Sequence, residues 1–215
     1  MSNIPMPSRD TTQLEPVLQR GVAEFLKRTK AAGLNVLITE VYRTSAYQDQ
    51  LYSQGRTKPG KIVTNLRGGQ SIHEYRCAFD ICRNVKGKEY DDSDNFFLKC
   101  GIVWEEMGGE WGGRWKSFPD KPHFQFTAGF TDSQIRAGAK IPDDAKMPWE
   151  IKAEKEEQEE EETEMRFNKL NEIPEWGKAT VEKLINKGAF GDKNALDLSM
   201  DMLRMFVIQD RLGRI

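Results

Sequence analysis

The sequence predicts a fold that mixes amphipathic helices with short strands, and three patterns carry this prediction. Apolar residues recur at helical spacing over 13–31 and again over 94–107. A short run at 34–42 is rich in Val, Ile, Leu and Thr, as buried strands are. Residues 123–126 alternate between polar and apolar side chains, which is typical of a strand with one buried face.

The first helix is expected to end at Gly33, because glycine is a common C-cap. The strand at 34–42 follows and delivers Arg43 at its end. A second, short helix over 45–54 begins with a serine cap and stops at Gly55. The first fifty residues therefore predict the order helix, strand, helix.

A long glycine-containing loop follows this helix and leads into Ser71 and His73. Alternation from Tyr75 to Ile81 predicts a second strand, and Lys86-Gly87 predicts a turn into a further short strand.

Ser93 is expected to cap the helix over 94–107. The alternation in the last strand, 123–126, predicts that His123 and Gln125 share one face, with the phenylalanines on the other.

Composition excludes several classes of function. A formal net charge of −2 provides no electrostatic footprint for nucleic acid. No stretch reaches the roughly 18–20 consecutive apolar residues of a membrane span, and the first residues lack the pattern of a secretory signal. Three cysteines are too few for a disulfide framework and are expected to stay reduced.

The chain of 215 residues suits one ordinary domain with a small appendage. Nine glutamates fall between residues 150 and 164, a run that is most often a solvated helix or a disordered spacer. We therefore expect a domain over 1–148, a Glu-rich linker over 149–165 and a small helical module over 166–215.

The two histidines of the chain, His73 and His123, each have a carboxylate nearby in the sequence. A catalytic zinc site uses three nitrogen or oxygen ligands and leaves one position for water, and Asp80 is a candidate third ligand. His73 and Asp80 would lie about 20 Å apart in a straight strand. A turn or bulge near Arg76 must therefore bring them together.

Asp120 lies three residues before His123 and is a candidate general base beside a metal-activated water. Arg43 is a candidate for stabilising a developing oxyanion or binding a substrate carboxylate. Each residue also has a structural alternative, such as a turn, a cap or a surface ion pair. A structural zinc site of Cys77, Cys82 and Cys100 with a histidine is a further alternative, although its spacing is not C-x-x-C.

Several separate motifs, spread in order over roughly residues 10–127, are more specific than the spacing of the ligand candidates. Their residues are Tyr42, Arg43, Gln48, Leu51, Tyr52, Gln54–Gly60, Val63–Asn65, Gly68–Ser71, His73, Ala78, Asp80, Trp111–Gly113, Trp115–Phe118, Asp120 and Pro122–Phe124. This series closely resembles phage endolysins that are L-alanyl-D-glutamate peptidases, of the zinc D-Ala-D-Ala carboxypeptidase family that also holds the D,D-carboxypeptidases of vancomycin resistance.

The resemblance implies an α+β fold in which a small antiparallel sheet holds the metal in a cleft with flanking helices. It implies a role for each of seven residues. These are His73, Asp80 and His123 as ligands of one Zn²⁺, Asp120 as the catalytic base, and Arg43, Ser71 and Gln48 as substrate-binding residues. Arg76 departs from the motif, which usually has glycine there, and we expect its side chain to lie in solvent.

The function implied is hydrolysis of the L-alanyl-D-glutamate bond of peptidoglycan stem peptides by a phage or prophage endolysin. Such an enzyme would be made in the host cytoplasm without a signal peptide and would act on the wall after release. The alternatives are a D,D-carboxypeptidase that removes terminal D-alanine and a non-catalytic wall-binding protein.

The C-terminal module is similar to a single surface-layer-homology-type motif. This resemblance implies that it binds a cell-wall polymer, and the alternative is a two-helix dimerisation or packing element. Its residues are Glu172–Trp176, Leu184, Gly188, Leu196 and Leu203–Arg204.

Overall fold

The computed structural model describes residues 4–192 and 194–215. The chain divides into two compact units, Met1–Ile151 and Lys152–Ile215, called here the N-terminal and C-terminal units. Each unit has its own cluster of buried apolar side chains. Among the described residues, the buried members of each cluster all come from one unit.

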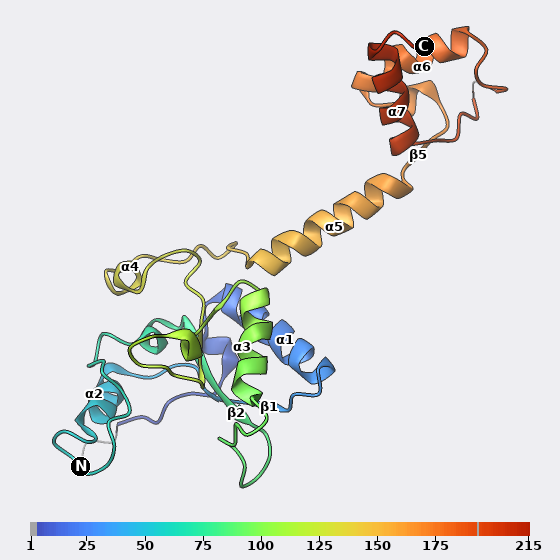
Figure 1. Ribbon diagram of the computed structural model, residues 1–215. Helices are drawn as coiled ribbons and strands as arrows, with labels where there is room; N and C mark the ends of the chain where they lie inside the picture. The colour runs from blue at the N-terminus through green and yellow to red at the C-terminus, as the bar shows by residue number, and fades with distance from the viewer. Residues whose placement is uncertain (1–3, 193) are drawn as a thin grey trace. The chain divides into compact units, whose positions relative to one another are not determined.

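The N-terminal unit is built on a four-stranded antiparallel sheet (Figure 1). The strands follow in the order β1 (Val36–Glu40), β2 (Ala78–Arg83), β4 (His123–Gln125) and β3 (Glu110–Trp111). The predicted α+β class, with a small antiparallel sheet and flanking helices, is confirmed.

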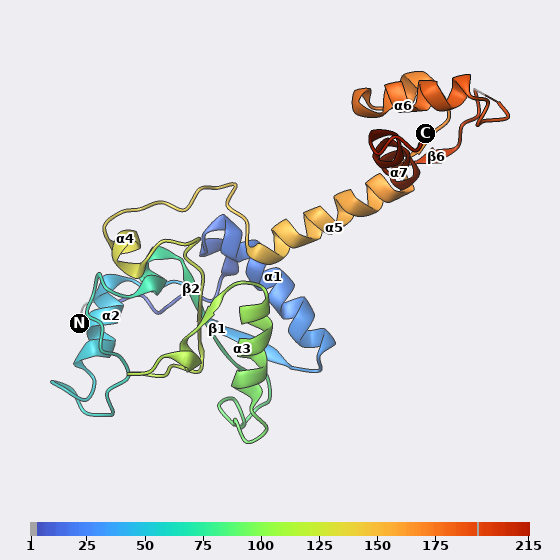
Figure 2. The same cartoon turned by 45° about the horizontal axis from the view of Figure 1, so that its top comes forward.

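Helices α1 (Pro16–Ala31) and α3 (Phe96–Glu106) contact each other beside the sheet, as the two views in Figures 1 and 2 show. Four aromatic side chains meet there with ring centroids 5.0–5.7 Å apart. Burial of one such ring contributes about 2–3 kcal/mol. The members of this aromatic core are Phe25 from α1, Phe79 from β2, Trp104 from α3 and Phe124 from β4.

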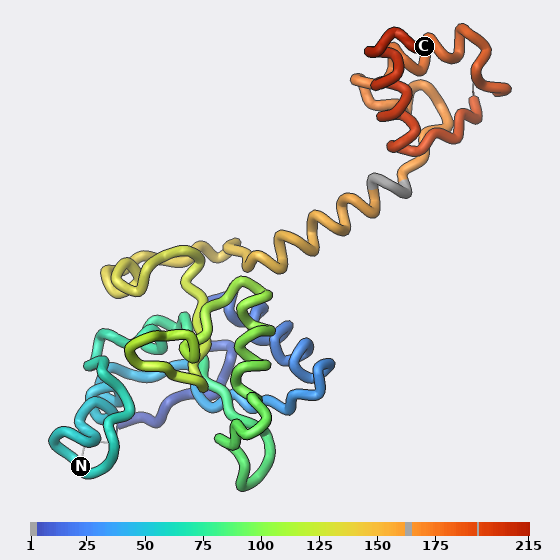
Figure 3. The backbone as a smooth tube through the Cα atoms, viewed as in Figure 1, coloured from blue at the N-terminus to red at the C-terminus, as the bar shows by residue number. Residues whose placement is uncertain are grey.

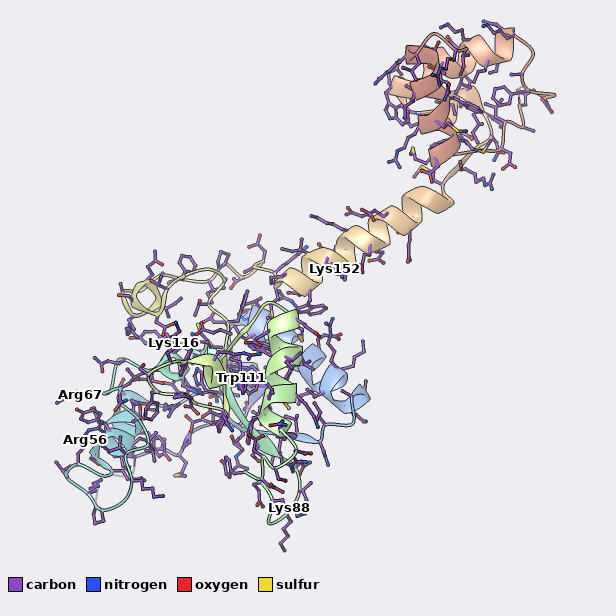
Figure 4. The ribbon with its side chains drawn as sticks, viewed as in Figure 1. Arg56, Arg67, Lys88, Trp111, Lys116 and Lys152 are labelled. Atoms are coloured by element: carbon purple, nitrogen blue, oxygen red, sulfur yellow. The ribbon has the colours of Figure 1, made fainter. Side chains whose placement is uncertain are left out.

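Helix α2 (Ser45–Ser53) starts at the expected place, but Thr44 caps it by accepting a hydrogen bond from the backbone N–H of Tyr47. The long loop that follows returns toward the sheet, and the tube in Figure 3 traces its path. Arg56 and Arg67, labelled in Figure 4, lie over the ring of Tyr52 at 3.9 Å and 4.8 Å from its centroid. The loop is thus fastened to α2.

Three short 3₁₀ turns and one short helix complete the N-terminal unit. They are η1 (Thr11–Gln13), η2 (Ile72–Tyr75), η3 (Gly112–Arg114) and α4 (Asp132–Arg136). The sequence predicted a turn near Arg76, where one of them ends, and predicted neither the first 3₁₀ turn nor the short helix. The expected strand from Tyr75 begins only at Ala78, because η2 occupies the preceding residues.

The region before α3 corrects two further predictions. Residues 84–95 form turns, and no strand follows Lys86-Gly87 among them. Ser93 does not cap α3, since the carboxylate of Asp92 accepts the backbone N–H of Phe97 instead. The residue that directly precedes the helix is Asn95, in the left-handed region at φ 60°.

The Glu-rich segment forms one continuous helix, α5 (Pro148–Glu164), and its side chains over 152–161 are exposed. The C-terminal unit continues with a two-stranded sheet and two larger helices. In chain order its elements are β5 (Arg166–Phe167), η4 (Leu170–Glu172), α6 (Glu175–Asn186), β6 (Leu198–Ser199) and α7 (Met200–Arg211). No helix among the described residues is both long and apolar enough to cross a bilayer.

Candidate metal centre

Three side chains from η2, β2 and β4 converge at one place on the sheet. His73 Nε2 lies 3.2 Å from Asp80 Oδ1 and 3.1 Å from His123 Nδ1. His123 Nδ1 lies 3.3 Å from Asp80 Oδ1. Among the described residues this is the one group of three or more His, Cys, Asp or Glu side chains whose ligand atoms lie within 4.8 Å of one another.

A tight turn brings His73 and Asp80 together. His73 lies in η2, and Arg76 ends that turn in the left-handed region at φ 61° before β2 begins. The predicted turn near Arg76 is thus confirmed. The Arg76 side chain is exposed, as expected, and its guanidinium lies 5.1 Å from the centre of the Tyr42 ring.

The strand register places the third ligand candidate. Asp80 in β2 pairs directly with His123 in β4, so the two side chains point to the same face of the sheet. The neighbouring pair, Phe79 and Phe124, points into the aromatic core on the other face. The alternation of apolar and polar residues in both strands therefore separates the core from the site.

The outer nitrogen of each imidazole has an acceptor. His73 Nδ1 lies 3.2 Å from the carbonyl oxygen of Val41, and His123 Nε2 lies 3.0 Å from Gln125 Oε1. Each of these nitrogens therefore carries the proton and donates. In the neutral rings the two nitrogens that face Asp80 then keep their lone pairs, which is the state in which imidazole binds a metal. Burial lowers the pKa of His123, but the neighbouring carboxylate of Asp80 outweighs burial and raises it.

The geometry of this cluster fits a metal ion. Asp80 Oδ1 is buried and accepts no hydrogen bond. Two lone pairs and a carboxylate oxygen at 3.1–3.3 Å from one another repel unless a cation lies between them. Ligands about 2.0–2.1 Å from a tetrahedral zinc would be about 3.3 Å apart, which matches these three distances.

Burial makes His73 a neutral ligand candidate. The His73 side chain is fully buried, and this burial lowers its pKa to about 4, although Asp80 opposes the shift. Metal binding at neutral pH therefore does not require removal of a proton from this ring.

Asp120 lies on the loop that precedes β4 and is joined to it by the bond from His123 N–H to the Asp120 carbonyl. Gly112 faces this loop closely, since its carbonyl accepts the N–H of Asp120. Burial raises the pKa of the Asp120 carboxyl, and the charge of Asp80 adds to this effect, while His123 and Arg43 oppose it. A raised pKa makes a carboxylate a better proton acceptor.

Arg43 reaches the cluster through an ion pair. Its Nε lies 2.6 Å from Glu40 Oε1, and both side chains are largely buried. Glu40 Oε1 lies 3.9 Å from His73 Nδ1. Burial raises the pKa of Glu40 to about 7 even though Arg43 opposes the shift.

Ser71 and Gln48, the two other residues predicted to bind substrate, are both buried. Ser71 is buried immediately before η2, and its backbone N–H donates to the carboxylate of Glu74. Gln48 is also buried, and its Nε2 donates to the Leu66 carbonyl and to Thr64 Oγ1. The amide of Gln48 thus holds the long loop, and the roles of Ser71 and Gln48 in substrate binding stay predictions.

Two further residues contact the cluster: Glu40, for which the sequence predicted no role, and Trp115, which belongs to the motifs of the resemblance. Glu40 was part of an expected strand, although an acid three residues before Arg43 was a usable signal. Trp115 places its ring 4.9 Å from that of His123, and it is half-buried. Its indole N–H donates to Glu110 Oε1 at 2.6 Å. Trp111, labelled in Figure 4, is instead buried and donates to the Lys121 carbonyl.

The alternative of a structural zinc site made by the three cysteines finds no support in the described part of the chain. Cys77, Cys82 and Cys100 are buried free thiols, and none of them belongs to the ligand group above.

Known proteins match the part of the chain that holds these residues. A family model described as D-alanyl-D-alanine carboxypeptidase matches residues 64–126, a range that includes His73, Asp80, Asp120 and His123. The peptidoglycan L-alanyl-D-glutamate endopeptidase CwlK of Bacillus subtilis (strain 168) is 39% identical over 135 residues, which span 58% of this chain and 78% of that protein.

Among solved structures, the crystal structure of the Serratia marcescens L-Ala D-Glu endopeptidase ChiX covers 59% of this chain and 92% of its own, with a TM-score of 0.43 and 21% identity.

Proposed function

The chain belongs to the M15 peptidase family, and from this premise we propose that it is a zinc-dependent endopeptidase that cuts the L-alanyl-D-glutamate bond of peptidoglycan stem peptides. The name of its relative CwlK supports the choice of bond. The observation that carries the proposal is the triangle of His73 Nε2, Asp80 Oδ1 and His123 Nδ1, since its edges of 3.1–3.3 Å suit one tetrahedral ion.

In this proposal the three side chains hold one Zn²⁺. A zinc ion held there would supply an activated water and a positive charge that polarises the scissile carbonyl. Asp120 accepts the proton of that water and passes it to the leaving amine, for which its raised pKa is suited.

Arg43 supplies positive charge on the same side of the site. The ion pair with Glu40 holds its guanidinium, so that little side-chain entropy is lost when a substrate binds. The remaining N–H groups of the fork are proposed to bind the scissile carbonyl or a substrate carboxylate.

The second candidate function is that of a D,D-carboxypeptidase, and the description of the matching family model favours it. The two activities leave different products. An endopeptidase cut creates a new N-terminal D-glutamate on the stem peptide, whereas a carboxypeptidase releases free D-alanine. Mass spectrometry of digested wall fragments separates them.

We further propose that the enzyme serves lysis by a phage or prophage, is synthesised in the host cytoplasm and acts on the wall after release. The C-terminal unit is proposed to bind a wall polymer. Its exposed Trp176 supports this, because an indole face at the surface can stack on a sugar ring.

The main test compares the wild-type chain with Asp120→Asn and with the control Asp144→Asn, a change at an exposed carboxylate. Asp120→Asn is expected to retain zinc and to lose about 10²–10⁴-fold in kcat/KM on a stem peptide, and the control is expected to match the wild type. A wild-type protein that binds no zinc would refute the metal site. Full activity in Asp120→Asn would refute the base, and wall binding without any cleavage would favour a non-catalytic binder.

A further inference from the structure

The carboxamide of Gln125 lies between a candidate metal ligand and two carboxylates. Gln125 is buried in β4, and its Oε1 accepts the Nε2–H of His123 at 3.0 Å. Its Nε2 donates to Glu110 Oε2 at 3.1 Å and to Asp132 Oδ1 at 3.3 Å. Both N–H groups of the amide and its oxygen are therefore used.

The two carboxylates fix the orientation of this amide. An amide nitrogen has two N–H donors, and Glu110 and Asp132 accept one each. If the amide were flipped, its oxygen would face two carboxylates that have no proton to offer. In the flipped state neither carboxylate would receive a proton from Gln125, so only the observed orientation satisfies both of them.

The fixed amide in turn selects the tautomer of His123. The amide oxygen only accepts, so the neighbouring Nε2 of His123 has to carry the proton. The other nitrogen, Nδ1, is then left with its lone pair toward Asp80 Oδ1 and His73 Nε2. This is the nitrogen that a metal in the triangle requires.

We propose that Gln125 is a positioning residue that fixes the tautomer of His123, and that Glu110 and Asp132 hold it in the orientation this requires. The inference rests on the proposed metal site. It goes beyond the family match, because Asp132 opens α4, which lies outside the matched residues 64–126. The segment after β4 thus contributes to the site through a single carboxylate.

The first experiment replaces Gln125 with methionine, which keeps the length of the side chain and removes its polar atoms. Gln125→Met is expected to weaken zinc binding about 10–100-fold in a competition with a chromogenic chelator. The control is Gln19→Met, because the Gln19 amide also makes two hydrogen bonds, to backbone carbonyls, but belongs to α1 and contacts no ligand candidate. We expect the control to bind zinc as the wild type does.

The second experiment keeps Gln125 and removes the carboxylates of Glu110 and Asp132, which orient its amide. In the double variant Glu110→Gln, Asp132→Asn both partners can donate as well as accept, so the amide is free to flip. We expect zinc affinity to fall about threefold to tenfold. In the metal-free protein, ¹⁵N NMR of the ring nitrogens should show one His123 tautomer in the wild type and a mixture in this double variant.

These readouts separate the inference from the proposed function. A wild-type protein without zinc affinity would refute the metal site, and the NMR measurement on the metal-free chain would still test the tautomer. The inference is overturned if Gln125→Met binds zinc within about twofold of the wild type, or if the double variant keeps a single His123 tautomer. A merely structural role for Gln125 would lower the melting temperature and leave the tautomer unchanged.

Discussion

Gly112 lies where no larger residue fits without moving the proposed base. A methyl group on its Cα would lie 2.6 Å from the Asp120 carbonyl oxygen and 3.1 Å from His123 Cβ. The first of these contacts is to backbone, so the loop itself would have to shift. We expect Gly112→Ala to lower kcat/KM on a stem peptide about 100-fold, because a displacement of about 1 Å has effects of this size.

Gly191→Ala is the control for this substitution, since a methyl group there meets no atom within 4 Å and the residue does not need a positive φ. Its kinetics should equal those of the wild type. Unchanged kinetics in Gly112→Ala would mean that the Asp120 loop does not have to keep its observed position.

Two buried thiols give the protein a specific response to alkaline pH. Burial raises the pKa of Cys77 and of Cys100 to about 12, whereas a thiol in the unfolded chain ionises near pH ~8.5. Above that pH the unfolded state has lost a proton that the folded state still holds, so stability falls as pH rises. The slope is at most about 1.4 kcal/mol per pH unit for each thiol.

Urea unfolding at several pH values between about 8 and 10.5 measures this slope. Cys100→Ala should show a shallower decrease than the wild type under reducing conditions. An identical slope in the variant would show that this thiol ionises equally in both states.

The site residues differ in how far the sequence predicts them. The ligand candidates could be named because the chain has two histidines, each with a carboxylate at a usable spacing. Their convergence could not be derived, since it depends on the left-handed backbone of Arg76. Gln125 was placed on the correct strand face, but its role depends on Glu110 and Asp132, which no local pattern connects to it.

Among the helices and strands, the length of an element decides whether its apolar pattern can be recognised in the sequence. Helices α1 and α3 are long enough for apolar periodicity to appear, and both lie within a few residues of the expected ranges. Strand β3 and helix α4 have two and five residues, which is too short for a period to be recognised. The strand expected from Tyr75 begins only at Ala78, because Tyr75 fits the alternation of a strand but is the last residue of the 3₁₀ turn η2.

Helix α5 should be sensitive to salt. It carries like-charged pairs at i,i+4, such as Glu156 with Glu160 and Glu157 with Glu161, and each pair destabilises a helix by about 0.2–0.5 kcal/mol. Raising ionic strength from about 0.01 to 1 M shortens the screening length from about 30 to 3 Å. We expect a peptide spanning 148–164 to gain helicity in far-UV circular dichroism.

A peptide with Glu160→Gln and Glu161→Gln tests the cause, because it lacks the two repulsive pairs named above and keeps the Lys152–Glu156 ion pair at 3.6 Å. At low salt the variant peptide should be more helical than the native peptide, and its helicity should change less as the ionic strength rises. A loss of helicity with salt in the native peptide would mean that attractive pairs dominate.

At the scale of the whole molecule, two separate cores predict two separate unfolding events. All three ligand candidates belong to the N-terminal unit, so zinc should stabilise only that unit. At a free concentration about 100 times Kd the gain is about 2.7 kcal/mol. Differential scanning calorimetry should show one transition that moves with zinc and one that does not.

Addition of a chelator reverses the expected shift and serves as the internal control. A single transition, or a zinc response in both, would contradict independent folding of the two units. If neither transition moved with zinc, the proposed metal site would be contradicted.

Both histidines of the chain lie in the ligand triangle, so no imidazole lies outside the site. Acylation of imidazole by diethyl pyrocarbonate would therefore report occupancy of the site alone, with protection by bound metal as its signal. The same scarcity makes a polyhistidine purification tag a poor choice, since six added rings would outnumber the native pair and compete for the ion under study.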